Sequence, residues 1–415
     1  MIFYIDEKLP LGRELFGRLG DVRAMPGRDI NPETPGLDEA DALVIRTDTK
    51  VTAGLLEAAP RLRMIGTASV GTDHVNFDAL REARGPDGEP VELFSAAGAN
   101  ARSVADYIWL ALCRITADAG EPLARRSMGI IGCGNCGSEV ARTAESFGMR
   151  VLRRDPPRAE AEDDFPGAAL EETLSADYVT LHVPLTTPDE SDYPTRNLLD
   201  ADRLAGMRPG GWLFNACRGA VVNSPALADA LEDGPLEGAV LDVYEDEPTP
   251  LKRLVRRTEL ATPHIAGYAI EGRRRATTMV YHAVCEHLGA EPVDTEPMLT
   301  GEFSPPEGRE VTFRATGEPR LDADNALRAL LRETYDIERV SRTLKNTLEE
   351  PDRGEAFDRL RNLEGSGRRH ELRSFGAAVH PDAAPQLRRE IRGRLYGLRM
   401  PLDADPPNYV VRPVQ

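Results

Sequence analysis

The 415-residue sequence predicts an α/β protein built on doubly wound parallel sheets, and three observations support this class. Short apolar runs alternate with segments of helical periodicity over the first hundred residues, and the alternation returns after residue 126. A glycine-rich turn joins a strand-like run to a helical segment near residue 132. The length exceeds that of one typical domain, so we expect several domains.

The first hundred residues predict one α/β layer. Strand-like runs occupy residues 2–5, 42–45 and 64–68, and helical patterns lie between them at 11–19 and 53–59. Strands that are separated by helices pair in parallel, because a parallel connection needs a crossover of this kind. We therefore expect a flavodoxin-like α/β domain here.

A second and more regular layer begins at residue 127. A helix over 100–117, with Val104, Ile108 and Leu112 on one stripe, leads into it. A long helix over 270–288 follows it, and we expect this helix to pack back on the first domain. The predicted strands of the second layer are 128–131, 150–152, 178–182, 212–215 and 239–243.

The composition changes after residue 289. Residues 291–306 are rich in proline and acid, which predicts a linker. The sequence then predicts a small α+β domain from a strand-like run at 311–315 and helical patterns at 323–333 and 355–362. The proline-rich tail from Asp403 is a candidate for disorder. The predicted domains are 1–98 with 270–290, then 99–269, then 291–415.

The composition also bounds the partners. The net charge of −18 argues against nucleic acid and anionic membranes, because the overall field repels both. Five cysteines without disulfide spacing indicate a reducing cytoplasm, and no secretion signal is visible at the start of the chain. The longest apolar stretch, around 107–113, is too short for a membrane span. We expect a cytoplasmic protein in which an anionic substrate needs a local basic pocket.

The strongest local motif is GCGNCG at 132–137, which follows an apolar strand and precedes a helix. This is the context of a dinucleotide-binding, or Rossmann, turn. Gly132 permits the tight turn, Gly134 lets backbone amides approach a pyrophosphate, and Gly137 allows the helix to pack closely on the strand. Asp155 follows 18 residues after Gly137, where a carboxylate can bind a ribose diol. The motif therefore predicts NAD rather than NADP.

Two alternatives accompany this motif. Arg153, Arg154 and Arg158 flank the aspartate and could meet a 2′-phosphate, which keeps NADP open. Cys133 and Cys136 form a Cys-x-x-Cys pattern, which suits a redox pair or half of a zinc site. No second Cys or His pair lies at ligand spacing in the sequence, so we expect no metal.

Three further segments follow predicted strands, on the side where doubly wound sheets bind ligands. They contribute Arg218, an acidic cluster at 242–247, and His264. Oxidation of a secondary alcohol needs a base for the hydroxyl proton and a cation that holds the substrate. Imidazole suits the base near neutral pH, and a guanidinium can bind a carboxylate through two parallel hydrogen bonds. The residues alone do not decide whether Glu245 or Glu247 supports the histidine.

Several stretches resemble the D-isomer-specific 2-hydroxyacid dehydrogenase family. Arg218 before an Ala-Val-Val run and His264 after Thr-Pro are typical of the family as a whole. Tyr268 and the Asp-Pro-Pro-Arg turn at 155–158 resemble the branch that oxidises 4-phospho-D-erythronate. The resemblance extends from residue 1 to roughly 373. Its other matching stretches are 66–75, 215–222, 262–268 and 271–272, with fragments at 335–337 and 357–361.

The resemblance implies roles for individual residues. Arg218 and Glu247 are then catalytic, and His264 is the proton donor or acceptor. The implied substrate contacts are Thr47, Thr67 and Tyr268. The cofactor-binding residues, including the glycines named above, are Gly132, Gly134, Asn135, Cys136, Gly137, Asp155, Val183, Ala216, Cys217, Arg218, Asp242 and Gly267.

The implied activity is NAD-dependent oxidation of 4-phospho-D-erythronate to 2-oxo-3-hydroxy-4-phosphobutanoate in pyridoxal 5′-phosphate biosynthesis. The implied assembly is a homodimer formed through residues 291–415. Arg46 and Lys50, beside Thr47, are open candidates for binding the substrate phosphate. The alternatives are another D-2-hydroxyacid dehydrogenase, such as one for 3-phosphoglycerate, or an NAD-sensing binding protein without catalysis. The combination of Arg218, Glu247 and His264 argues against the binding protein.

Overall fold

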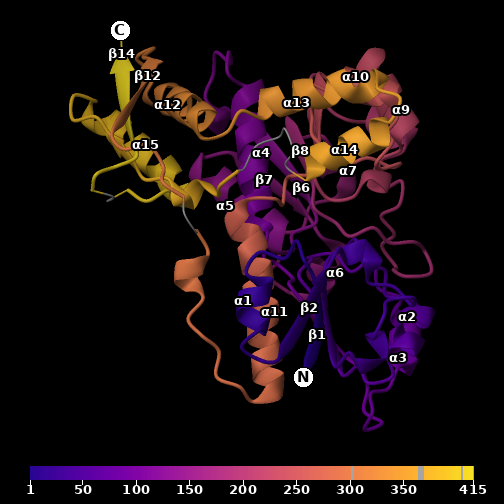
Figure 1. The fold of residues 1–415 in the computed structure, drawn as a ribbon. Coiled ribbons are helices and arrows are strands. Elements are labelled where there is room, and N and C mark those ends of the chain that lie inside the picture. Colours follow the sequence, from indigo (N-terminus) through magenta and orange to yellow (C-terminus); the bar gives the residue numbers. More distant parts are fainter. Residues whose placement is uncertain (301–302, 363–368, 403–404, 415) are drawn as a thin grey trace. The chain divides into compact units, whose positions relative to one another are not determined.

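The computed structural model describes residues 1–300, 303–362, 369–402 and 405–414, in two compact units (Figure 1). The first unit comprises Met1–Asn100 and Ile270–Phe303. The second unit comprises Ala101–Ala269 and Ser304–Gln415. None of the helices in the described ranges combines the length and the apolar character that a membrane crossing requires.

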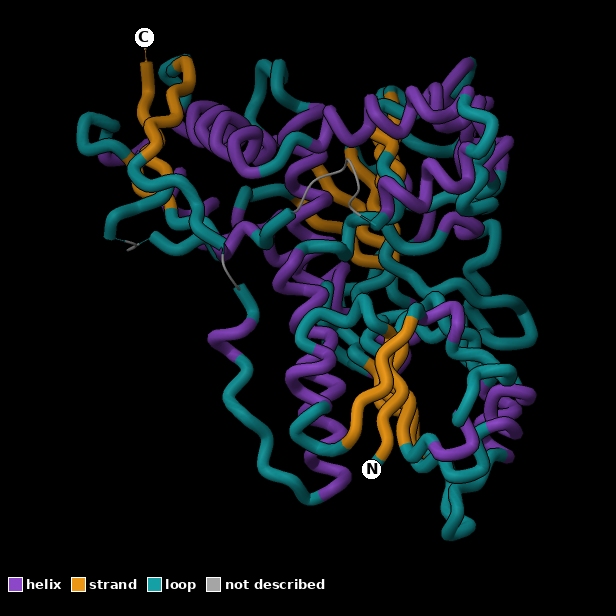
Figure 2. The backbone as a smooth tube through the Cα atoms, viewed as in Figure 1, coloured by secondary structure: helices purple, strands orange, loops and turns teal. Residues whose placement is uncertain are grey.

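The first unit contains a five-stranded parallel sheet with the strand order β2-β1-β3-β4-β5 (Figure 2). This is the order of flavodoxin-like folds, the class predicted for this part of the chain, although the sequence pattern predicts only β1, β3 and β4. Its strands are β1 (Ile2–Asp6), β2 (Asp21–Met25), β3 (Ala42–Ile45), β4 (Met64–Thr67) and β5 (Glu92–Ser95). Its helices are α1 (Gly12–Phe16), α2 (Ala53–Ala58), α3 (Phe77–Glu82) and α11 (Ile270–Leu288).

Alternate side chains of β1 enter hydrophobic cores on opposite faces of this sheet. Phe3 packs in one core with Val280 and Tyr281 of α11, whereas Tyr4 lies in the other core with residues of β3 and β4. A Cβ on Gly66 of β4 would lie 2.3 Å from Val280 Cγ1, so α11 approaches the sheet closely. The predicted return of residues 270–288 to the first domain is confirmed.

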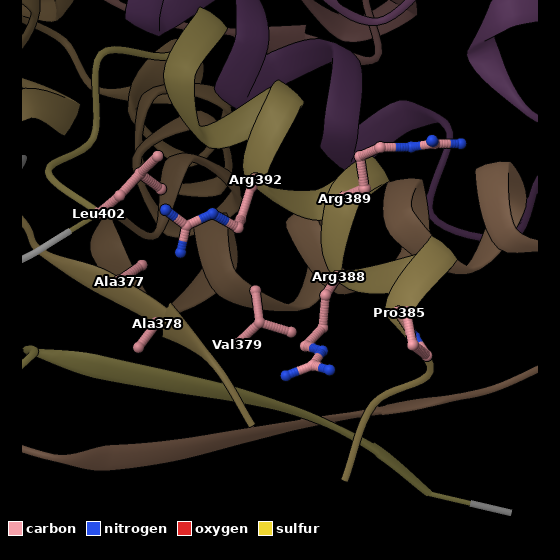
Figure 3. Close-up of a pocket in the computed structure, with 8 residues that line it drawn as sticks. All are labelled: Ala377, Ala378, Val379, Pro385, Arg388, Arg389, Arg392 and Leu402. Atoms are coloured by element: carbon pink, nitrogen blue, oxygen red, sulfur yellow. The ribbon is translucent and has the colours of Figure 1, made fainter. Parts of the chain in front are cut away.

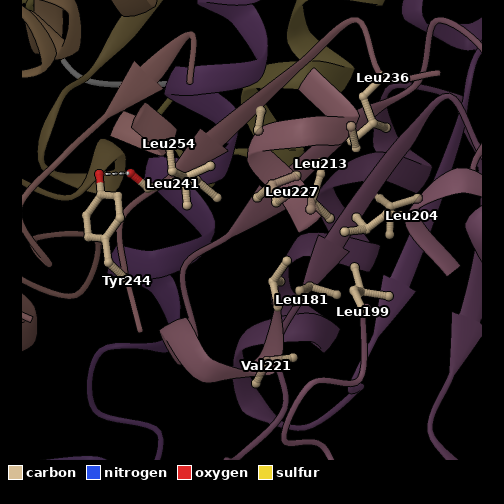
Figure 4. Close-up of a cluster of buried hydrophobic side chains, with 14 of the residues drawn as sticks. Leu181, Leu199, Leu204, Leu213, Val221, Leu227, Leu236, Leu241, Tyr244 and Leu254 are labelled. Atoms are coloured by element: carbon tan, nitrogen blue, oxygen red, sulfur yellow. Dashed lines mark hydrogen bonds between the residues drawn. The ribbon is translucent and has the colours of Figure 1, made fainter. Parts of the chain in front are cut away.

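The second unit contains a six-stranded parallel sheet with the order β11-β10-β9-β8-β6-β7. The sequence pattern predicts five of these strands but not β11, because a run of 2 residues has no readable alternation. Leu181, Leu213 and Leu241 lie in the buried core of this sheet (Figure 4). The strands are β6 (Ser127–Ile131), β7 (Arg150–Arg154), β8 (Tyr178–Leu181), β9 (Trp212–Asn215), β10 (Gly238–Leu241) and β11 (Leu260–Ala261).

Helices cover both faces of this sheet. The first of them, α4 (Ala101–Ile115), is the helix predicted at 100–117, and it is buried along almost its whole length. Its Trp109 stacks on Phe147, with the ring centroids 4.7 Å apart. The other helices of this part of the chain are α5 (Asn135–Ser146), α6 (Pro156–Ala161), α7 (Leu170–Leu174), α8 (Ala201–Ala205), α9 (Ser224–Glu232) and α10 (Lys252–Arg257). Of these, α6 has no buried residue and does not cover the sheet.

Residues 304–415 belong to the same compact unit as the six-stranded sheet. Their three strands are parallel in the order β12-β14-β13, with β12 (Arg309–Arg314), β13 (Ala377–Val379) and β14 (Tyr409–Val414). Their helices are α12 (Pro319–Thr334), α13 (Ile337–Asn346), α14 (Arg353–Arg361) and α15 (Pro385–Gly397).

The expectation of a disordered tail is wrong for residues 409–414. They form the central strand β14, which pairs with a neighbour on each side, and Tyr409 is buried. The hydrophobic residues between the prolines supply this strand, and its partners are distant in sequence. Residues 403–404 and 415 of the predicted tail lie outside the described residues.

Candidate active site

The glycine loop connects β6 to α5 in the second unit. Gly132 has a φ of +89°, and a Cβ there would lie 2.5 Å from the carbonyl oxygen of His182. A Cβ on Gly137 would lie 2.0 Å from the carbonyl oxygen of Gly132, so neither position accepts a side chain. Gly134 is the N-cap of α5 and has open space where its Cβ would lie. The loop fits a dinucleotide pyrophosphate, because the first N–H groups of a helix have no acceptor within the helix and point toward an anion at its end.

Asp155 lies beside this loop, directly after β7. The backbone N–H of Cys133 donates to Asp155 Oδ2 at 2.7 Å, and the N–H of Arg158 donates to Oδ1 at 3.2 Å. Arg153 and Arg158 are each engaged by a glutamate, and Arg158 also donates to the carbonyl of Cys133. Two of the three flanking arginines therefore already have partners, which favours NAD over NADP.

The loop thiols are not activated. All five cysteines are free, and burial raises the pKa of Cys133 to about 11 and that of Cys136 to about 12. Cys217 is buried, and burial raises the pKa of its thiol as well. Among the described residues, no group of three or more His, Cys, Asp or Glu side chains could hold a metal ion.

His264 and Glu247 form a hydrogen-bonded pair. Nδ1 of His264 lies 2.7 Å from Oε2 of Glu247, and Oε1 of Glu247 accepts the backbone N–H of Tyr244 at 2.9 Å. Burial opposes ionisation of Glu247, but attraction to His264 and these hydrogen bonds outweigh it, so the pKa of Glu247 is lowered. Glu245 is exposed. The geometry therefore pairs the histidine with Glu247, a choice that the sequence pattern leaves open.

A buried carboxylate, Asp242, holds the turn that presents His264. Asp242 accepts the Thr262 hydroxyl at 2.6 Å and the backbone N–H groups of Ile265 and Ala266 at 2.8 Å each. Burial raises the pKa of Asp242. His264 itself has a φ of 57°, in the left-handed region, so the turn needs this support.

The loop that contains Arg218 touches the loop that contains Glu247. Strands β9, β10 and β11 end level with one another, and a Cβ on Gly219 would lie 1.9 Å from the carbonyl carbon of Tyr244. Nη1 of Arg218 donates to the carbonyl of Cys217 at 2.8 Å. The three predicted segments thus leave the sheet at one edge.

The remaining predicted cofactor residues line the same edge. Val183 borders the glycine loop, because its Cγ1 would lie 2.8 Å from a Cβ on Gly132. Asn135 and Cys136 open helix α5. Ala216 directly follows β9, and Gly267 and Tyr268 continue the turn after His264.

The two predicted substrate residues of the first unit lie at the ends of β3 and β4, which are paired through Ile45 and Thr67. Thr67 is the last residue of β4, and Thr47 lies two residues after β3. Thr67 is fully buried, and its hydroxyl lies 3.0 Å from Nε2 of His74. Thr47 is partly exposed and Lys50 is exposed. The expected substrate contacts of these residues stay predictions.

Arg46, the other candidate for the substrate phosphate, is already paired. Its Nε donates to Asp6 at 2.8 Å and its Nη2 to Asp48 at 3.1 Å, and its side chain is 13% exposed. Two carboxylates therefore balance its charge.

Comparison with known proteins identifies the family. Residues 96–266 match the sequence profile of the D-isomer specific 2-hydroxyacid dehydrogenase, NAD binding domain. The chain is 41% identical over 413 residues to an erythronate-4-phosphate dehydrogenase of Salinibacter ruber, covering 96% of this chain and 98% of that relative. It is 43% identical over 356 residues to one of Aeromonas hydrophila, covering 84% and 89%. The chain belongs to the D-isomer-specific 2-hydroxyacid dehydrogenase family.

Solved structures agree with this membership in the family. The TT0316 protein of Thermus thermophilus is 29% identical with a TM-score of 0.56, covering 70% of this chain and 98% of that one. D-lactate dehydrogenase of Aquifex aeolicus, complexed with NAD and lactic acid, is 26% identical with a TM-score of 0.52, covering 70% and 96%. The predicted fold class, the enzyme class and the NAD cofactor of this 2-hydroxyacid dehydrogenase are confirmed.

One residue beside the turn that contains His264 is not predicted from the sequence. Arg369 is 2% exposed, its Nη2 donates to the carbonyl of Ala266, and it forms a parallel bridge with Ala269. Its Nε and Nη1 have no hydrogen-bond partner within the described part of the chain. The only signal in the sequence is an arginine in an arginine-rich segment, so the contact could not be foreseen.

Proposed function

We propose that this dehydrogenase oxidises the 2-hydroxyl of 4-phospho-D-erythronate to give 2-oxo-3-hydroxy-4-phosphobutanoate in pyridoxal 5′-phosphate biosynthesis. The observation that supports it most is the pair of His264 and Glu247, 2.7 Å apart at the sheet edge that also presents the glycine loop. The choice of substrate rests on the 41% identity to the Salinibacter ruber erythronate-4-phosphate dehydrogenase.

His264 is the proposed acceptor of the hydroxyl proton. Its Nδ1 is engaged by Glu247, which leaves Nε2 as the ring nitrogen that meets the substrate. Glu247 stays ionised, so it fixes the ring orientation and stabilises the imidazolium that forms. NAD, when bound, supplies the hydride acceptor.

Arg218 is the proposed anchor of the substrate carboxylate. A guanidinium can donate two parallel hydrogen bonds to a carboxylate, which fixes the orientation of the adjacent carbon. Thr47, Thr67 and Tyr268 are the other proposed substrate contacts. Lys50 is the better candidate for the substrate phosphate, because it is exposed whereas Arg46 is bound by two carboxylates.

The proposed protein is a cytoplasmic homodimer in which the two copies meet through residues 291–415. The cysteine content supports the cytoplasmic location, and the family resemblance supports the homodimer. Sedimentation equilibrium of the full chain measures the mass in solution, and a monomer mass at micromolar concentration would contradict it.

Stopped-flow reduction of enzyme-bound NAD tests the proposed substrate. We expect rapid formation of NADH with 4-phospho-D-erythronate, and at least a hundredfold slower formation with 3-phospho-D-glycerate or D-lactate, because the pocket would leave its polar groups unpaired with the wrong acid. Faster reduction by 3-phospho-D-glycerate would assign a different dehydrogenase. Tight NAD binding without reduction by any acid would identify a sensing protein.

A further inference from the structure

A buried tyrosine of α4, Tyr107, is connected to the turn that contains His264 through two hydrogen bonds. Its hydroxyl lies 2.7 Å from the hydroxyl of Thr262, which donates to Oδ1 of Asp242 at 2.6 Å. All three side chains are buried, and all belong to the second unit. None of them lines the pocket between β13 and α15 that Figure 3 shows, so these hydrogen bonds are not part of that cavity.

The hydrogen atoms along these bonds have one direction. Asp242 accepts the backbone N–H groups of Ile265 and Ala266, so its carboxylate acts as an acceptor. Thr262 therefore donates to it. A hydroxyl has one hydrogen, so the oxygen of Thr262 accepts the hydrogen of Tyr107. Burial raises the pKa of Tyr107 well above its ordinary value, so the phenol keeps the proton that it donates.

The turn at the other end of these bonds is strained. His264 has a φ of 57°, and a backbone of this kind persists only where the surrounding structure over-determines it. The backbone N–H of His264 donates to the carbonyl of Asp242 at 2.7 Å, and the carboxylate of Asp242 accepts the next two N–H groups. Asp242 thus holds the turn through its backbone and through its side chain, and the hydroxyl of Thr262 fixes the orientation of that side chain.

Helix α4 is a fixed point for this arrangement. The helix is buried along almost its whole length. The residue before Tyr107, Asp106, accepts the backbone N–H of Leu372 at 2.8 Å and Nε of Arg102 at 2.6 Å. Contacts that are independent of His264 therefore hold the helix where Tyr107 leaves it.

We propose that Tyr107 is a positioning residue for His264. It acts through Thr262 and Asp242, whose hydrogen bonds keep the turn in the conformation that presents the imidazole to Glu247 and to the substrate. The inference rests on the proposed role of His264 as the proton acceptor. Tyr107 is fully buried, so we expect its hydroxyl to affect kcat and not the KM for the hydroxy acid.

Variants that keep the side-chain shape and remove one hydroxyl test this proposal in the full chain. With NAD and 4-phospho-D-erythronate, we expect Y107F and T262V each to lower kcat about tenfold, because the imidazole is less well oriented. The KM for the hydroxy acid should stay within about twofold of the native value. T262S keeps the hydroxyl and should recover most of the loss seen in T262V. The double variant should lose about as much as either single variant, because both break the same series of bonds.

Two controls separate a positioning role from a structural one. Y409F and T258V each remove a hydroxyl from an equally buried residue of the second unit, where that hydroxyl donates to a backbone carbonyl. We expect both controls to keep the native kcat, even where their loss of Tm equals that of Y107F and T262V.

The outcomes distinguish this inference from the proposed function. Native kcat in Y107F and T262V, together with a loss of kcat in H264Q, would overturn the inference alone. A loss that T262S does not recover, that the controls share, or that multiplies in the double variant would overturn it as well. Native kcat in H264Q would instead overturn the proposed function, and this inference with it.

Discussion

The five-stranded and the six-stranded parallel sheets begin with the same strand arrangement but carry different loops. In each sheet the second strand lies outside the first, and the third strand follows on the other side, in the orders β2-β1-β3 and β7-β6-β8. An aspartate before the third strand binds the first N–H of the first strand in both. Asp41 accepts from Ile2 and Asp177 accepts from Ser127, each at 2.8 Å. The two sheets therefore share both the order of their first three strands and the aspartate that holds the start of the first strand.

The difference lies in the turn after the first strand. In the second unit the turn is the glycine loop, and it opens the 12-residue helix α5. In the first unit the turn contains Leu11 at a φ of 64° and leads into the 5-residue α1. Only the glycine loop of the second unit lies at the start of a long helix and has open space beside a glycine. Sites on this architecture therefore depend on the loops, not on the sheet.

Replacement of the proposed base gives the largest expected effect. His264→Gln should lower kcat by roughly 10²- to 10⁴-fold, because the proton acceptor is lost, while NAD affinity stays unchanged. Rapid kinetics with 4-phospho-D-erythronate and equilibrium titration with NAD measure the two quantities. His282→Gln, a histidine of α11 bonded to Thr295, is the matched control in the first unit and should keep full turnover. A kcat near the native value in His264→Gln would refute the proposed role.

A side chain introduced into the glycine loop gives the next largest expected effect, which is a loss of NAD affinity. Gly134→Val should raise Kd for NAD roughly 10- to 100-fold, because the added methyl groups occupy the space that a pyrophosphate needs. The Tm should hardly change, since no atom lies within 4 Å of the Cβ position. Gly120 has equally open surroundings, so Gly120→Val is the control, and equal loss of NAD affinity in both variants would contradict this account.

Replacement of Arg369, in the C-terminal segment, gives a smaller expected decrease in kcat than replacement of His264. Arg369→Met should lower kcat about 10- to 100-fold, because the turn that presents His264 loses its support at Ala266. The pH profile of kcat should also move, and Arg369→Lys should restore part of the rate. Arg394→Met removes an equally buried arginine, paired with Asp324, and serves as the control. If both methionine variants lose only Tm, Arg369 is structural.

Loss of the aspartate that accepts the first strand's N–H gives the smallest expected effect, a decrease in the free energy of unfolding that depends on pH. Burial opposes ionisation of Asp177, but hydrogen bonds from Ser127 and Arg126 outweigh it and lower the pKa of this carboxyl. A lowered pKa stabilises the folded state above the unfolded value of about 4, and the gain is lost as the pH falls below it.

Asp177→Asn should therefore cost about 1–3 kcal/mol of unfolding free energy at pH 7, and less as the pH falls below about 4. Asp41→Asn should also destabilise the first sheet at pH 7, because Asp41 accepts the equivalent hydrogen bond from the backbone N–H of Ile2. Denaturant unfolding over a pH series measures both variants. A penalty that does not change with pH would contradict the ionised role of Asp177.

Sequence periodicity predicts most of the sheets because their strands are short apolar runs between turn residues. The predicted strand 212–215 and helix 270–288 agree with β9 and α11 at both ends. The glycine loop is equally predictable, since its function depends on one local spacing. Asp155 follows at a fixed distance because one helix and one strand separate it from the loop.

Contacts between segments that are distant in sequence cannot be predicted from such local patterns. The choice of Glu247 over Glu245 depends on how the turn after β10 folds back to His264. Strand β14 follows two prolines and contains Pro413, so the sequence does not mark it as a strand, and it is regular through its partners β12 and β13. Arg369 meets Ala266 across 103 positions of chain, so no local signal marks it.

The bond between Arg369 and Ala266 has a consequence for judging natural variants of this chain. We expect a substitution at Arg369 to slow turnover although this position belongs to none of the catalytic or cofactor-binding motifs. A ranking of variants by their distance along the sequence from Arg218, Glu247 and His264 would class such a change as harmless. Distance in space from the Ala266 carbonyl is the better measure.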